Sequence, residues 1–261
     1  MQTDISIPTN TKNQLIKQAI SSEVADFIKS DPAQFMHNYT NKLDQEVAAF
    51  IASQFSYGSR AQFIPKIASL LELAGNSPHN WVKTGAYKKQ IKPTEKKFYR
   101  FNSYEDLVLF LNRIKELIAQ SGSLEEAVKN HYLKFEQENP IGLQQTICAL
   151  FSGVLIVAQN PKSACKKINM FLRWMGRDNS PVDLGIWKWI DKKKLLIPLD
   201  THVMKQAIAF NLIPAKAQAT SKTAILLTKR LSELFPDDPA KGDFALFMPD
   251  GKAHTSHDDD F

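Results

Sequence analysis

The stretch that decides the fold class is SYEDLVLFLNRIKELI, residues 103–118. Its apolar residues recur every three or four positions, which is the spacing of one face of an α-helix. They are Leu107, Phe110, Leu111, Ile114, Leu117 and Ile118. Ser103 is followed three residues later by the acidic Asp106, a pair that is typical of a helix N-terminus. The stretch therefore predicts an amphipathic helix.

Helical spacing recurs along most of the chain. Ser123 with Glu126 repeats the N-terminal signal, and Asp31-Pro32 is a second kind of helix start. Alternating apolar runs with Asn-Gly or Asp-Gly turns, which mark β-hairpins, are nearly missing. We therefore predict an all-α fold. Its further helices are expected near residues 47–55, 63–71, 141–157, 163–175, 201–210 and 218–235.

Composition bounds the class of protein. The 261 residues carry 33 Lys and Arg against 27 Asp and Glu, and 43% are hydrophobic, as in folded globular proteins. No apolar run approaches the roughly 20 residues that cross a bilayer, and the start has no apolar leader, so we expect a cytoplasmic protein without a membrane partner. Two cysteines exclude a four-cysteine iron–sulfur cluster, and neither GxGxxG nor GxxxxGKS/T occurs, so no cofactor is expected.

Three segments organise the chain. We expect an N-terminal extension over residues 1–19, a helical domain over 20–248 and a disordered tail over 249–261. The tail contains His254, His257 and Asp258 to Asp260, which could ligate a metal. A polar chain end without apolar support is more often solvated, so we assign no metal site.

Basic residues concentrate in two segments. Residues 81–101 carry seven cations against the single acid Glu95, with aromatic residues between them; residues 162–194 carry nine cations against three aspartates. Cations can neutralise phosphates while aromatic rings stack on unpaired bases, so both segments favour a nucleic-acid partner. The alternative for each is a solvated face, with the aromatic residues of the first segment anchored in the core.

The segment IPLDTHVM, residues 197–204, delivers Asp200 to the start of a helix. Asp200 is well placed as an N-cap, and N-cap aspartates are common whether or not they take part in catalysis. Upstream, the sequence predicts a helix to residue 157, a short turn and a new helix from Ser163, with Lys166 and Lys167 in its first turn. Only folding could bring these lysines to Asp200.

Most of the chain resembles a prokaryotic family designated domain of unknown function 2400. The blocks that carry the resemblance are SACKKINMFLRWMGRDNSPVDLGIWKWI (163–190), IPLDTHV (197–203), DDPAKGDFALF (237–247), DPAQFMHNYTNKLDQEVAAFIASQFSYGSRAQFIPKI (31–67) and YRFNSYEDLVLFL (99–111). That family is remotely similar to the helix-hairpin-helix DNA glycosylases. Their hallmark is a helical hairpin followed by the aspartate of a Val/Leu-Asp-Thr-His-Val motif, which Asp200 matches.

The resemblance implies two helical lobes, a DNA-binding cleft between them and a flipped nucleobase in a pocket at their junction. A carboxylate near the anomeric carbon, here Asp200, would stabilise the positive charge that develops on the sugar when the N-glycosidic bond breaks. In bifunctional members a lysine amine attacks the same carbon, forms a Schiff base and goes on to cleave the strand. Lys166 or Lys167 matches that lysine by position. The layout is most similar to the archaeal 8-oxoguanine glycosylases.

Helical phase leaves both lysines open. Lys167 lies near the edge of the apolar face that begins at Ile168, Lys166 lies farther round, and the resemblance favours the first lysine of the pair. The connection AQNPKSACK, residues 158–166, lacks the glycines usual in such hairpins, although N–H groups at Ser163 could still bind phosphate.

Further candidate residues follow from these comparisons. The base pocket would draw on Trp187, Trp174 and His202, with Trp189 as a further aromatic, although such aromatic residues are more often core and His202 could serve only to orient Asp200. The candidate DNA contacts are Lys162, Ser163, Arg173, Lys88 and Lys89.

The sequence thus predicts a monomeric DNA base-excision repair glycosylase with AP-lyase activity that acts on damaged duplex DNA, with an oxidised purine as the expected base. The first alternative is a nucleic-acid-binding protein that kept this fold and lost catalysis. The second is a helical interaction protein whose basic segments meet an acidic protein partner.

Overall fold

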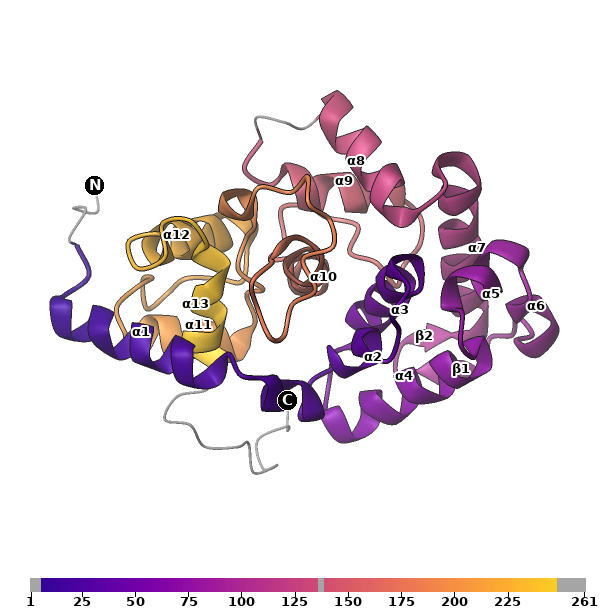
Figure 1. Ribbon diagram of the computed structural model, residues 1–261, viewed down its shortest axis with the longest axis horizontal. Coiled ribbons are helices and arrows are strands. Elements are labelled where there is room, and N and C mark those ends of the chain that lie inside the picture. The colour runs from indigo at the N-terminus through magenta and orange to yellow at the C-terminus, as the bar shows by residue number, and fades with distance from the viewer. Residues whose placement is uncertain (1–5, 136–138, 248–261) are drawn as a thin grey trace. The chain divides into compact units, whose positions relative to one another are not determined.

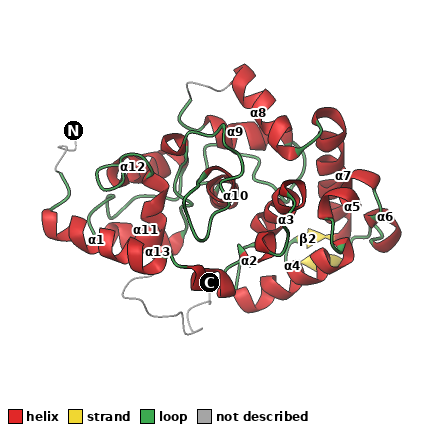
Figure 2. Cartoon of the chain, viewed as in Figure 1, coloured by secondary structure: helices red, strands yellow, loops and turns green. Residues whose placement is uncertain are grey.

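The computed structural model describes residues 6–135 and 139–247, so the predicted tail over 249–261 lies outside the described residues. Helices make up most of the described chain, with one short two-stranded ribbon (Figures 1 and 2). The predicted all-α class is confirmed. Within these two ranges, every helix is too short or too polar to span a bilayer.

The described chain forms two compact units. Unit 1 combines residues 6–29 with 161–247, and unit 2 comprises 30–135 and 139–160. The elements of unit 1 are α1 (Thr9–Ser22), η1 (Ala25–Ser30, which runs into unit 2), α10 (Lys166–Gly176), η2 (Lys192–Lys194), α11 (Thr201–Ala209), α12 (Ser221–Leu231), η3 (Pro239–Lys241) and α13 (Gly242–Phe247). Those of unit 2 are α2 (Gln34–His37), α3 (Lys42–Phe55), α4 (Arg60–Ala74), α5 (Pro78–Thr84), α6 (Tyr87–Gln90), β1 (Lys97–Tyr99), β2 (Asn102–Ser103), α7 (Tyr104–Ser121), α8 (Leu124–Phe135) and α9 (Gly142–Leu150).

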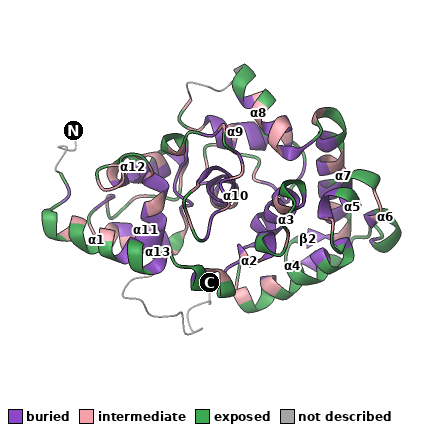
Figure 3. Cartoon of the chain, viewed as in Figure 1, coloured by how far each residue is buried: buried purple, intermediate pink, exposed green. Residues whose placement is uncertain are grey.

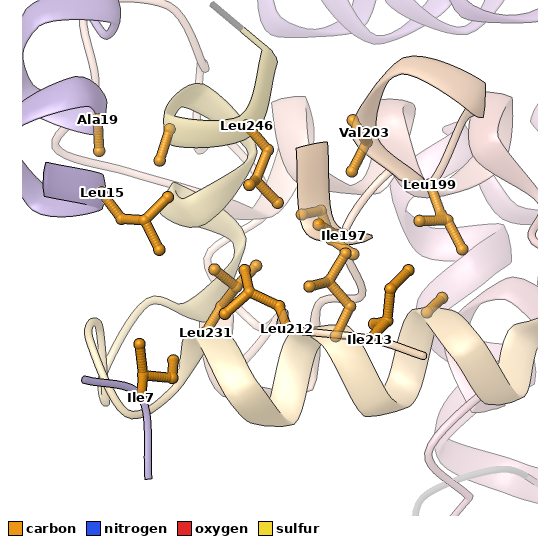
Figure 4. Close-up of a cluster of buried hydrophobic side chains, with 14 of the residues drawn as sticks. Ile7, Leu15, Ala19, Ile197, Leu199, Val203, Leu212, Ile213, Leu231 and Leu246 are labelled. Carbon is orange, nitrogen blue, oxygen red and sulfur yellow. The ribbon is translucent and has the colours of Figure 1, made fainter. Parts of the chain in front are cut away.

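One cluster of buried side chains in unit 1 is aliphatic (Figure 4). Helices α1, α11, α12 and α13 direct their apolar faces into it, and α1 packs along α13 although the two lie at opposite ends of the chain. Each buried Leu or Ile contributes about 1.5–3 kcal/mol relative to an exposed one. The labelled members of the cluster are Ile7, Leu15, Ala19, Ile197, Leu199, Val203, Leu212, Ile213, Leu231 and Leu246.

Helix α3 organises unit 2. Its apolar face supplies Phe50, whose ring lies 5.6 Å from that of Phe110 on α7 and 4.8 Å from that of Phe151. Near its N-terminus, α3 carries two buried carboxylates. Asp44 accepts a hydrogen bond from the His79 N–H at the start of α5, and Glu46 accepts from the first N–H groups of α8. Carboxylates at helix N-termini satisfy donors that the helix itself leaves unpaired.

Helix α7 begins as the sequence predicts. The Ser103 hydroxyl accepts a hydrogen bond from the Asp106 N–H, and the Asp106 carboxylate accepts from the Ser103 N–H. At the start of α8, the Ser123 hydroxyl accepts a hydrogen bond from the Glu126 N–H. Both helix starts are confirmed.

The two helices predicted to flank the short turn have other bounds. Helix α9 ends at Leu150 rather than near 157, and α10 begins at Lys166 rather than at Ser163. The side-chain amide of Gln159 explains the earlier end, because it donates to the carbonyls of Phe151, Val154 and Val157 and so folds the connection into turns. The predicted bounds were wrong, and α9 and α10 belong to different units.

Candidate functional site

Helix α10 starts after an abrupt change of backbone direction. Cys165, which precedes the first helical residue, has a φ of +45°, a conformation that few non-glycine residues adopt. Just before it, Ser163 forms an isolated β-bridge with Thr220, and the Lys162 carbonyl accepts from the Ser221 N–H. The chain is thereby tied to the start of α12 before it turns into α10. This turn places Lys166 in the first turn of the helix.

Asp200 is the N-cap of α11. The Asp200 Oδ1 atom accepts a hydrogen bond from the Val203 N–H at 2.8 Å. The preceding residues Ile197 and Leu199 are buried in the core of unit 1, which fixes where the carboxylate emerges. The predicted N-cap role is confirmed.

The second oxygen of the same carboxylate meets Lys166. The Lys166 Nζ atom lies 2.9 Å from Asp200 Oδ2, and the side chains are 37% and 20% exposed respectively. Burial would raise the pKa of Asp200, but the ammonium of Lys166 and the Val203 N–H outweigh that effect and lower the pKa below its usual value. One carboxylate therefore caps a helix and holds a partly exposed lysine, and it stays ionised at neutral pH.

Lys167 has a different environment. Its side chain is only partly exposed, and burial lowers the pKa of its amine from 10.5 to about 8. A pKa of about 8 leaves on the order of a tenth of the amine uncharged at pH 7. A nucleophilic amine needs to lie close to the reacting centre and to lose its proton. Lys166 lies next to the Asp200 carboxylate, and Lys167 has the lowered pKa.

A second carboxylate lies near Lys166 and Asp200. Asp243, the second residue of α13, is buried and contacts the Arg173 guanidinium. Burial raises the pKa of Asp243 to about 6, although Arg173 acts to lower it. The charge of Asp200 raises it further, while that of Lys166 opposes this. A group that gains a proton near pH 6 therefore acts electrostatically on Lys166 and Asp200.

Arg173, which contacts Asp243, and Arg177 are the two arginines of a buried ion network around α10. Asp183 joins them, since its two carboxylate oxygens accept from Arg173 Nε at 3.2 Å and Arg177 Nη1 at 2.5 Å. The Arg177 guanidinium also contacts Glu23 at 2.6 Å and Asp238 at 2.8 Å. The network ties α10 to the chain after α1 and to the segment that leads into α13.

The predicted DNA contacts lie in several places. Lys88 and Lys89 are exposed on α6 in unit 2, and Lys162 is exposed in unit 1. Ser163 lies in the bridge to Thr220 and not at a helix start, so its expected position was wrong. Arg173 is 4% exposed at its side chain and faces two carboxylates inside unit 1, which leaves it no surface for a phosphate contact.

The aromatic candidates for a base pocket are mostly buried. Trp174 and Trp187 have no exposed surface, and Trp187 packs edge-on against Phe171 at 5.1 Å. Trp189 is partly exposed and stacks on Trp187 at 6.3 Å, because residues 187–189 form a turn and not a helix. His202 is partly exposed and its charge helps to lower the pKa of Asp200.

Sequence reasoning missed Asp243, Asp183 and the role of Arg177. The available signal was the composition of α10, which is buried on all sides from Ile168 onward (Figure 3). An arginine in a helix without a solvated face requires carboxylate partners from elsewhere. The sequence does not say which carboxylates they are.

A family model described as "Protein of unknown function (DUF2400)" matches residues 31–251. The chain belongs to this family. The match contains Lys166, Asp200, Asp243 and the whole ion network except Glu23. No curated protein and no solved structure matches the chain, so the family is the extent of what these comparisons show.

Proposed function

We propose that this protein is a DNA glycosylase with AP-lyase activity, in which Lys166 is the nucleophile and Asp200 the stabilising carboxylate. The observation that carries the proposal is the 2.9 Å contact between Lys166 Nζ and Asp200 Oδ2 at the starts of two helices. A reaction at the anomeric carbon of a nucleotide needs an amine and a carboxylate within reach of the same atom. The partial exposure of both groups leaves room for a substrate to approach them.

The reaction would proceed as follows. Lys166 first gives up the proton of its ammonium group to solvent. The uncharged amine then attacks C1′ of the sugar, the N-glycosidic bond breaks, and its electron pair leaves with the base, which takes up a proton. Loss of a proton from the nitrogen and opening of the sugar ring give a Schiff base between Lys166 and C1′. Removal of a C2′ proton then expels the 3′ phosphate, and water hydrolyses the Schiff base. Throughout, Asp200 would stabilise the positive charge on the sugar.

Lys167 is the rival nucleophile within the same proposal. Its lowered pKa, about 8, supplies the uncharged amine that attack requires. Lys166 is preferred because its distance to Asp200 already meets the geometric requirement. The helix-hairpin-helix glycosylase fold and an oxidised purine as the damaged base also belong to the proposal and rest on the sequence resemblance.

Borohydride trapping tests the chemistry directly. Duplexes carrying 8-oxoguanine, uracil or an abasic site are incubated with the wild type and with Lys166→Gln, Lys167→Gln and Asp200→Asn variants. Lys205→Gln is the matched control, because Lys205 is exposed on α11 away from its N-terminus. Asparagine keeps the helix cap, so Asp200→Asn isolates the loss of charge.

We expect a covalent adduct that Lys166→Gln abolishes and Lys205→Gln leaves unchanged. Asp200→Asn should slow its formation about a hundredfold or more. An adduct that only Lys167→Gln abolishes would reassign the nucleophile. No adduct and no base release on any duplex, with DNA binding intact, would refute the enzyme and favour a non-catalytic nucleic-acid-binding protein, in which the Lys166–Asp200 pair is only a structural cap.

A further inference from the structure

The ribbon of unit 2 ends in an exposed aromatic residue. Strands β1 and β2 are joined by the two-residue turn Arg100-Phe101. Phe98 and Tyr99 on β1 are buried, with 6% and 5% of their surface exposed, whereas Phe101 is 79% exposed. Of the five aromatic residues in the basic segment 81–101, the described structure buries four and leaves Phe101 at the surface.

The turn is held rigidly. Tyr99 Oη donates a hydrogen bond to the Tyr57 carbonyl at 2.5 Å, and Asn102 Nδ2 donates to Tyr57 Oη at 2.8 Å. Arg100 has a φ of +49°, and its guanidinium lies over the Tyr57 ring, 6.0 Å from the ring centroid. A non-glycine residue in this conformation carries about 1–3 kcal/mol of backbone strain, which the surrounding contacts must offset.

Gly58 makes this arrangement possible. A Cβ atom at Gly58 would collide with the Arg100 guanidinium, so a side chain there would displace it. The ribbon therefore presents the Phe101 ring on a fixed support instead of a loose loop. A ring carried on a rigid backbone requires little ordering of the chain when it binds a partner.

The surroundings of Phe101 are positively charged. Lys92, Lys96, Lys97 and Arg100 are all exposed on the ribbon and the chain that leads into it, against the single acid Glu95. The Lys97 Nζ atom donates to the Phe101 carbonyl at 2.8 Å, which places an ammonium group beside the turn. An apolar ring with cations beside it fits a partner that carries several negative charges and also has a flat ring on which Phe101 can stack.

We propose that this ribbon binds DNA at an unstacked base, with the Phe101 ring stacked on the base and the cations beside it neutralising the flanking phosphates. Aromatic rings recognise every base through its face, and lysines recognise the phosphate backbone without regard to sequence. The inference rests on the proposed function only in that both require DNA as the partner. It places a DNA contact in unit 2, whereas the proposed chemistry belongs to unit 1.

Fluorescence of 2-aminopurine tests the stacking, because this base is quenched when an aromatic ring stacks on it. The full chain is titrated against a single strand that contains 2-aminopurine and against an intact duplex. The variants are Phe101→Ala, Phe101→Trp and the double variant Lys96→Gln with Lys97→Gln. Leu109→Ala is the control, since Leu109 is an exposed apolar residue of α7, 50% exposed and outside the turn.

We expect Phe101→Ala to weaken single-strand binding about 5- to 150-fold and to abolish the quenching. Phe101→Trp should keep both the single-strand affinity and the quenching, and Leu109→Ala should behave as the wild type. The double variant should make the slope of log affinity against log salt less steep by about 1.4. Equal affinity for Phe101→Ala and the wild type, equal losses on strand and duplex, or no binding of DNA by the wild type would each overturn the proposal.

The two proposals can fail separately. If the wild type forms no borohydride adduct yet shows Phe101-dependent quenching, the enzyme is refuted and the ribbon stands. If adducts form and Phe101→Ala binds as the wild type does, the ribbon is refuted and the enzyme stands.

Discussion

The two basic segments have similar compositions and different structures. In segment 81–101 the lysines lie on the surface, and Arg100 supports an exposed turn. In segment 162–194 the two arginines, Arg173 and Arg177, lie inside unit 1 among carboxylates. The difference comes from what folds around each segment, and charge density alone does not reveal it.

The partners explain the contrast. In unit 1, Arg173 and Arg177 form ion pairs with four carboxylates from other parts of the unit. These are Glu23, Asp183, Asp238 and Asp243. Among the lysines of the same segment, Lys192 pairs with Asp178 at 2.7 Å, and its side chain is 29% exposed. A basic segment is therefore evidence for a polyanion surface only after its internal partners are known.

The largest expected effect is that of Arg177→Met. Removing this guanidinium takes one cationic partner away from three carboxylates, and losing one member of a buried ion pair costs about 3–5 kcal/mol. The free energy of unfolding from urea denaturation should fall by that amount. Lys188→Met is the control, because Lys188 is 67% exposed and should change stability by less than about 0.5 kcal/mol. Equal effects of the two variants would mean that the network adds no stability.

An intermediate effect is expected for Lys167→Met. Burial lowers the pKa of Lys167 to about 8, so below pH 8 the folded protein bears the full cost of the buried ammonium, up to about 3 kcal/mol. Methionine removes that cost, and the variant should be more stable at pH 7. The free energy of unfolding of the wild type should rise between pH 8 and pH 10.5. The difference in this free energy between Lys167→Met and the wild type should therefore be smaller at pH 9.5 than at pH 7. A gap that is independent of pH would contradict the lowered pKa.

The smallest effect on stability is expected when Lys88 and Lys89 are both changed to Gln. Both lie exposed on α6, so the melting temperature should stay nearly constant. If segment 81–101 contacts duplex DNA, the slope of log affinity against log salt should fall by about 1.8. An unchanged slope would identify these lysines as part of a solvated face.

Local signals were enough for much of the fold. The caps at Ser103 and Ser123 and the apolar face of α7 follow from residues a few positions apart, and the structure confirms them. The bounds of α9 and α10 failed because a side-chain amide, that of Gln159, replaces helical hydrogen bonds with turns. Such a competition depends on the folded connection and leaves little trace in hydrophobic spacing.

For the candidate site too, local sequence predicts some features, and others depend on how distant helices pack. The N-cap position of Asp200 follows from its neighbours in sequence, and the structure confirms it. The contact with Lys166 and the charge of Asp243 depend on how α10, α11 and α13 pack, which spacing does not encode. Both lysines remained open in the sequence. In the structure, Lys166 contacts Asp200, and burial lowers the pKa of Lys167.

Unit 1 is built from two stretches at opposite ends of the described chain, and this affects how the chain folds during synthesis. Unit 2 is built from residues that follow one another, whereas α1 needs α13 as its packing partner and must wait until the ribosome has made nearly the whole described chain. The apolar face of α1, with Leu15 and Ala19, is therefore uncovered for most of translation. We therefore expect α1 to be open to non-native apolar contacts until α13 has been made.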